Sequence, residues 1–73
     1  ALIVVQQDKP GVVAHITSAL SERGVNIAFM RLFRTGKGST AYTIVESDQR
    51  LPGDIAEELR ANLNITDVMV VQR

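Results

Sequence analysis

The sequence has no cysteine and no tryptophan, and aromatic residues make up only 4% of its 73 residues. Without cysteine the chain forms no disulfide, no thiolate nucleophile and no soft metal-carrying loop, and the single His15 offers no metal cluster. Eight basic and eight acidic residues cancel, so we expect neither nucleic acid nor a membrane surface as partner. Long apolar runs and a signal-peptide pattern are also missing, which predicts a cytoplasmic protein.

Hydrophobic residues, in contrast, make up 45% of the chain. Residues 1–73 suffice for one domain, and a domain this small buries only about 60% of its extended-chain surface. The apolar surplus therefore predicts self-association. Because the sequence opens on Ala1 and runs directly into a strand-like segment, we expect a domain excised from a longer protein.

Hydrophobic periodicity and turn residues divide the chain into six elements. Strands alternate or are β-branched, and helices repeat apolar residues every three or four positions. The second strand changes phase, which predicts a bulge near residues 28–30. Strands are predicted at 2–7, 25–34, 40–47 and 64–72, and helices at 10–23 and 52–62.

The order β-α-β-β-α-β fixes much of the topology. Because each helix must cross over in the right-handed sense, the first and third strands lie together in the centre. The prediction is an α+β, ferredoxin-like fold: a four-stranded antiparallel sheet of order 4-1-3-2 with two helices on one face. The bare face and the outer strand edges should then contact a partner, most simply in a homodimer.

The turn at residues 6–11 is the candidate ligand site. Pro10 suits the first turn of a helix, Asp8 could accept from its unpaired N–H groups, and Gly11 leaves room near the backbone. A helix N-terminus binds anions such as the carboxylate of an amino acid. Taken alone, the same residues are also typical of an ordinary strand-to-helix turn.

Other candidate sites are weaker. An RNA-recognition surface needs aromatic residues on the central strands, where only Tyr42 is found, and the cations Arg31, Arg34 and Lys37 are typical of a solvated face. The glycines at 36 and 38 indicate a hairpin connection at 35–39 and not a phosphate-binding loop. His15 has no nucleophile within sequence reach, so no catalytic constellation is predicted.

Three segments together resemble the ACT domain family: residues 4–12, 24–27 and 41–48. The resemblance covers essentially the whole chain. It implies a β-α-β-β-α-β module that binds a small ligand, usually an amino acid, and regulates an attached metabolic enzyme without being catalytic itself.

Within that family, residues 26–31 and 34–38 are most similar to the ACT domain of bacterial iron–sulfur L-serine dehydratases, which convert L-serine to pyruvate and ammonia. The regulatory domain of D-3-phosphoglycerate dehydrogenases is next. In serine-binding relatives the ligand lies between two domains, at positions that correspond to Gln6, Asp8 and Asn26. The resemblance thus implies L-serine as ligand at Gln6, Asp8, Gly11 and Asn26. It implies no cofactor in this domain, the 4Fe–4S cluster of such a parent lying elsewhere.

Two other interpretations stay open. The domain could serve only to dimerise its parent through the sheet face or the strand edges, without a ligand. A small hydrolase of the acylphosphatase type shares the fold but needs an arginine in the first turn, where Lys9 is a poor substitute.

Overall fold

The fold is seen in a computed structural model, which describes residues 1–34 and 40–71. The predicted hairpin connection at 35–39 lies outside the described residues. The elements follow the predicted order: β1 (Leu2–Gln7), α1 (Val12–Glu22), β2 (Ile27–Arg34), β3 (Thr40–Ser47), α2 (Ile55–Arg60) and β4 (Ile65–Val70).

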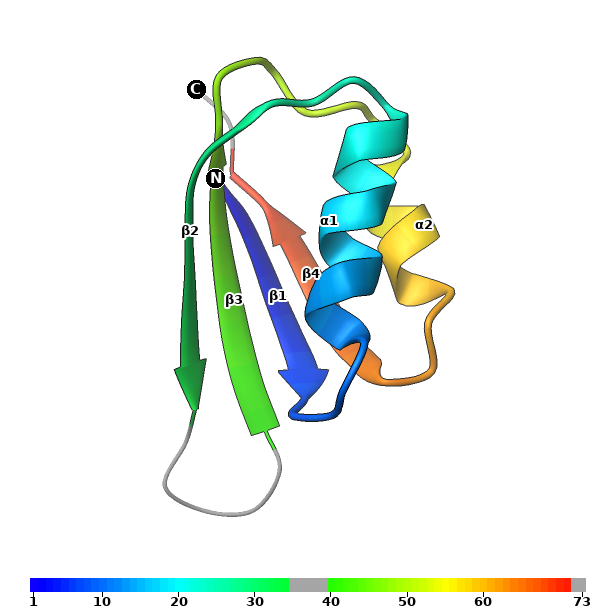
Figure 1. The fold of residues 1–73 in the computed structure, drawn as a ribbon. Helices are drawn as coiled ribbons and strands as arrows, with labels where there is room; N and C mark the ends of the chain where they lie inside the picture. The colour runs from blue at the N-terminus through cyan, green and yellow to red at the C-terminus, as the bar shows by residue number, and fades with distance from the viewer. Residues whose placement is uncertain (35–39, 72–73) are drawn as a thin grey trace.

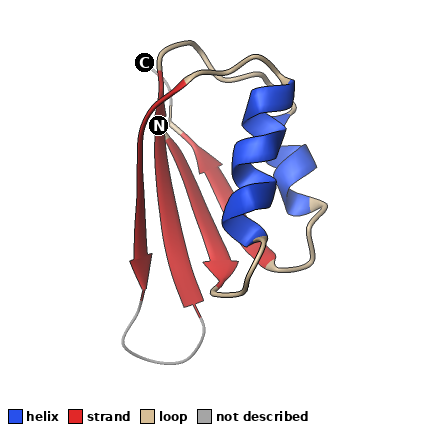
Figure 2. Ribbon diagram, in the orientation of Figure 1, coloured by secondary structure: helices blue, strands red, loops and turns tan. Residues whose placement is uncertain are grey.

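The four strands form one antiparallel sheet in the order β2-β3-β1-β4, which confirms the predicted topology. The register of β2 on β3 shifts between Ile27 and Phe29, so the expected bulge is present. A second irregularity, between Val5 and Gln6, lies where β1 pairs with β4. Both helices cover the same side of the sheet (Figures 1 and 2). Neither of these described helices is long and apolar enough to cross a membrane.

Both helices are shorter than predicted. The first begins at Val12 and not at Pro10, because Gly11 precedes it with a left-handed φ of 87° that no helical residue adopts. The second begins at Ile55, since Pro52 and Gly53 belong to a turn in which the Ile55 N–H donates to the Pro52 carbonyl. Each observed helix lies within the predicted one, but the predictions counted the turn residues before each helix as helical.

The end of α1 is closed by Gly24, which directly follows the helix predicted at 10–23. Its φ is 71°, and its N–H donates to Ser21 while the next N–H, of Val25, donates to Leu20, both at 3.0 Å. This pair of bonds satisfies two carbonyls of the last turn and is the Schellman motif. Because Leu20 and Val25 are both buried, the motif also directs the chain back toward the sheet.

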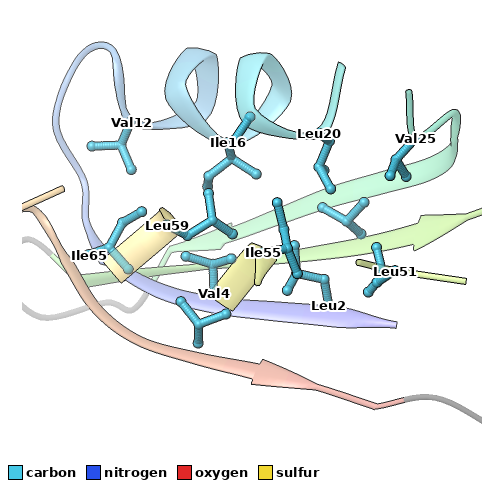
Figure 3. Close-up of a cluster of buried hydrophobic side chains, with 13 residues drawn as sticks. Leu2, Val4, Val12, Ile16, Leu20, Val25, Leu51, Ile55, Leu59 and Ile65 are labelled. Atoms are coloured by element: carbon cyan, nitrogen blue, oxygen red, sulfur yellow. The ribbon is translucent and has the colours of Figure 1, made fainter. Parts of the chain in front are cut away.

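The core lies between the sheet and the two helices. Figure 3 shows side chains of both helices meeting those of β1 and the loops. Alternate residues of the central strands point into it, and Leu2, Val4 and Val45 have no exposed surface. The buried cluster comprises Leu2, Val4, Val12, Ile16, Ala19, Leu20, Val25, Val45, Leu51, Ile55, Leu59, Ile65 and Val68.

A cluster of charges ties the two helices together at the end of α1. Arg23 Nη2 donates to Asp54 Oδ2 at 3.0 Å, and its Nη1 contacts Glu58 Oε2. The hydrogen bond from Arg23 is the main cause that lowers the pKa of Asp54 below its usual range. The arginine thus neutralises the acidic first turn of α2.

The other side of the sheet is open, as predicted. It carries large apolar side chains from three strands, including Phe29 (53% exposed), Tyr42 and Met69. Arg31 lies on the same side, with its guanidinium carbon 4.6 Å from the centre of the Phe33 ring. This open face is apolar with charges at its margin.

Replacing Gly24 by alanine should lower the free energy of unfolding by about 1–2 kcal/mol, because a left-handed residue with a Cβ is strained. A Cβ at Gly24 or at Gly53 would meet no described atom within 4 Å, so crowding plays no part. Gly53→Ala is the control, since Gly53 has no positive φ. Urea unfolding measures both, and equal stability of the two variants would contradict the backbone argument.

Candidate functional site: a cavity at the β1–α1 turn

A cavity of about 370 Å³ opens where β1 ends and α1 begins. This volume lies near the lower limit of small-molecule sites, which are roughly 300–1,000 Å³. Polar and apolar groups share its wall, and α1 and β2 form its sides. The lining that matters here is Gln6, Asp8, Gly11, Val13, Leu32 and Arg34.

The cavity follows from one row of residues across the sheet. Gln6 of β1 and Arg34 of β2 are both paired with Ala41 of β3, so the three lie side by side on the helix-covered face. The methyl group of Ala41 is short, whereas its neighbours in the row have long polar side chains. The core therefore ends at this row and leaves space between α1 and β2.

Gln6 is the buried polar group of the site. It is only 2% exposed, and its Oε1 accepts a hydrogen bond of 2.6 Å from the hydroxyl of Thr43, which is itself fully buried. Because Thr43 engages the amide oxygen, the amide nitrogen is the group that Gln6 can offer to a ligand.

Asp8 does not cap α1, contrary to the sequence-based expectation. Its Oδ2 instead accepts a hydrogen bond of 2.6 Å from Arg34 Nε. The turn through Lys9 and Pro10 separates Asp8 from the first residue of α1, and the carboxylate is directed toward β2. Arg34 was expected among the solvated cations, whereas the structure places it in the cavity lining. Residues two positions apart in a strand share a face, so the apolar Leu32 could have indicated that Arg34 lies on the helix-covered side.

Gly11 is needed for its conformation more than for the room it leaves. It is the N-cap of α1, and no described side chain caps the helix. A Cβ at Gly11 would meet no described atom within 4 Å, so within one chain no close approach demands glycine. The first turn of α1 therefore has neither a side-chain cap nor an acidic residue, and the start of a helix favours an anion.

Asn26 lies apart from the other three predicted residues. It precedes β2, where its Nδ2 donates to Asp48 and its N–H donates to Gln49. Residues 41 and 47 lie near the two ends of β3, about 20 Å apart at the usual rise per residue. Asn26 is beside the far end, because Ile27 pairs with Ser47 and the Asp48 N–H donates to the Asn26 carbonyl. The structure brings Gln6, Asp8 and Gly11 together, and ligand binding by any of the four stays a prediction.

Two other features lie outside this cavity. A larger cavity, about 500 Å³, lies at the opposite end of the sheet near Ala1, Glu46 and Arg50, and none of the four predicted site residues lines it. His15 Nε2 is buried without a partner among the described residues, yet His15 is outside both linings. The described residues contain no cluster of three or more side chains that could hold a metal ion.

Comparison with known families agrees with this fold. The profile of the ACT domain matches residues 1–64. The chain belongs to the ACT domain family. ACT domains bind amino acids and need no cofactor for it.

Two curated proteins are similar to this ACT domain. A D-3-phosphoglycerate dehydrogenase of Methanocaldococcus jannaschii is 29% identical over 69 residues, which are 94% of this chain and 13% of the dehydrogenase. A probable L-serine dehydratase, beta chain, of Bacillus subtilis is 32% identical over 68 residues, which are 93% of this chain and 31% of that protein. This ACT domain therefore corresponds to a minor part of each relative.

Thr43→Val should lower the free energy of unfolding by about 1–3 kcal/mol, because it leaves the buried oxygen of Gln6 without a donor while keeping the side-chain shape. Thr66→Val is the matched control, since Thr66 is exposed on β4, and it should change stability by less than about 0.5 kcal/mol. Urea unfolding distinguishes the two. If both variants lose the same stability, Thr43 does not hold Gln6.

Proposed function

We propose that this ACT domain binds a small amino acid, L-serine foremost, and thereby regulates a serine-metabolising enzyme of which it is a part. The observation that carries the proposal is the cavity at the β1–α1 turn, where complementary groups converge. Asp8 can accept from an ammonium group, while Gln6 Nε2 and the first turn of α1 can donate to a carboxylate. A free amino acid has both groups on one carbon.

The parent enzyme that we propose is an L-serine dehydratase. The similarity to the beta chain of a probable L-serine dehydratase supports this choice, as does the likeness of residues 26–31. A D-3-phosphoglycerate dehydrogenase is the alternative, supported by similar identity over a similar length. In either case catalysis would belong to the remainder of the parent, since the matched segment is 13% or 31% of those relatives.

We also propose that two copies associate through β2. This edge strand is exposed over most of its length, and no described strand pairs with its outer side. It carries apolar side chains on both faces, with Phe29 and Phe33 on the open face and Met30 and Leu32 on the helix-covered face. A strand that is apolar on both sides gains from a partner more than a solvated edge does.

Two-fold pairing of β2 with its copy would also account for Asn26. The two strands would run antiparallel, so the start of the partner's strand would lie beside the end of this one. A register centred on Met30 would set the partner's Asn26 opposite Arg34, at the rim of the cavity. The site would then be completed between two domains, as the resemblance implies for serine-binding relatives.

An ACT domain that only dimerises its parent is the competing function. The exposed apolar strand favours it as much as it favours ligand-dependent assembly. The two functions differ in whether the cavity is ever occupied, so binding experiments on the isolated chain separate them.

L-serine at 100 times its dissociation constant should stabilise the wild-type chain by about 2.7 kcal/mol. Since each kcal/mol raises the melting temperature of a domain this small by roughly 4–8 °C, a thermal-shift assay with a panel of amino acids measures the effect. Asn26→Ala should remove most of the shift, whereas Asn64→Ala, outside the cavity lining, should retain it. No shift with any amino acid at millimolar concentration would leave the dimerising function.

Met30→Lys should reduce the dimer to the 8.0 kDa monomer, because two ammonium groups would meet across the two-fold axis. Ile44→Lys is the control on the open face and should remain dimeric. Light scattering over a concentration series provides the mass. If Ile44→Lys dissociates and Met30→Lys does not, the open face and not β2 forms the contact.

A further inference from the structure

Arg34 and Asp8 form an ion pair that contributes little to the free energy of unfolding. Their side chains are 64% and 34% exposed, and ion pairs so accessible to water contribute about 0–1 kcal/mol. Both residues end an element, Asp8 just beyond β1 and Arg34 at the end of β2. Both residues line the cavity.

The two partners of this pair are also the two counterions of a zwitterion. The carboxylate of Asp8 suits an α-ammonium group, and the guanidinium of Arg34 suits an α-carboxylate. Asp8 contacts Nε, one of five N–H donors on a guanidinium that commonly holds a carboxylate through two parallel bonds. A bound amino acid would exchange one protein ion pair for two pairs with the ligand.

The remaining wall explains why Arg34 can reach such a ligand. Ala41 lies between Arg34 and Gln6 in the same row, so no long side chain separates the guanidinium from the cavity floor. Val13 and Leu32 add apolar wall, and Lys9 is the other cation of the lining. Arg34 is the cation of the lining that forms an ion pair with Asp8.

We infer that Arg34 is a specificity-determining residue, which selects ligands for a free α-carboxylate and releases Asp8 to bind the α-ammonium group. This inference rests on the proposed amino-acid site and restricts its ligands to free α-amino acids. Amines and amino-acid amides lack the partner of Arg34, and α-hydroxy acids lack the partner of Asp8.

Calorimetric titration with L-serine and L-serinamide tests the role of Arg34, because the two probes differ in the carboxylate alone. The wild-type chain should bind L-serine at least tenfold more tightly than L-serinamide. Arg34→Gln should weaken L-serine binding by about tenfold, which is about 1.4 kcal/mol, and should bring the preference close to one. Arg31→Gln is the matched control, since Arg31 lies on the same strand over Phe33 and on the opposite face, and it should keep the wild-type preference.

The outcomes separate this inference from the proposed function. If the wild-type chain binds L-serine and Arg34→Gln retains the preference over L-serinamide, the role of Arg34 is wrong and the amino-acid site stands. If the folded wild-type chain binds neither probe, the site and the inference both fail. Asp8→Asn offers a second measurement, because it should abolish the preference for L-serine over glycerate and leave the preference over L-serinamide.

Discussion

The hydrogen bond from Thr43 to Gln6 marks the place where the apolar core ends and the cavity begins. On the helix-covered face, the rows of β1 and β3 change from Leu2 and Val45 to Val4 and Thr43, and then to Gln6 and Ala41. A glutamine buried to this degree needs a partner, and the threonine in the next row supplies it. One short bond thus lets a polar side chain line the floor of the site without weakening the core beside it.

β2 contributes little to the buried core. The core cluster draws on β1, β3, β4 and both helices but on no residue of β2 except the partly buried Ile27. The edge strand is attached through its ladder with β3, and its apolar side chains contribute little to the core of a single copy. The side of the cavity that β2 forms is therefore the side that packs least against the buried core.

The sequence predicted the parts of this fold that depend on local patterns. The bounds of β1 and β3, the sheet order, the bulge in β2 and the Gly24 helix end agree with the structure, because alternation, crossover handedness and glycine conformation can be read from neighbouring residues. The missing cap of α1 could not be read in this way, because the partner of Asp8 is not its neighbour in sequence. The ion pair of Asp8 with Arg34 depends on the register of two strands on β3, and that register is a property of the assembled sheet.

The same reasoning explains the site: Gln6, Asp8 and Gly11 are neighbours in sequence and stay together in space, whereas Asn26 is separated from them by the whole length of α1. No pattern within the chain tells whether such a residue approaches the site from the same copy or from another one.

The first and last described residues are hydrogen-bonded to each other, and this affects how a bound ligand would influence an attached enzyme. The Val71 N–H donates to the Ala1 carbonyl at 2.8 Å, so in a longer chain both flanking segments would leave from one corner of the domain. The cavity lies at the other end of a body whose longest extent is 33 Å. A ligand there would be remote from both attachment points, and its effect would travel to an attached enzyme through the strands or through the neighbouring copy, and not by touching the linkers.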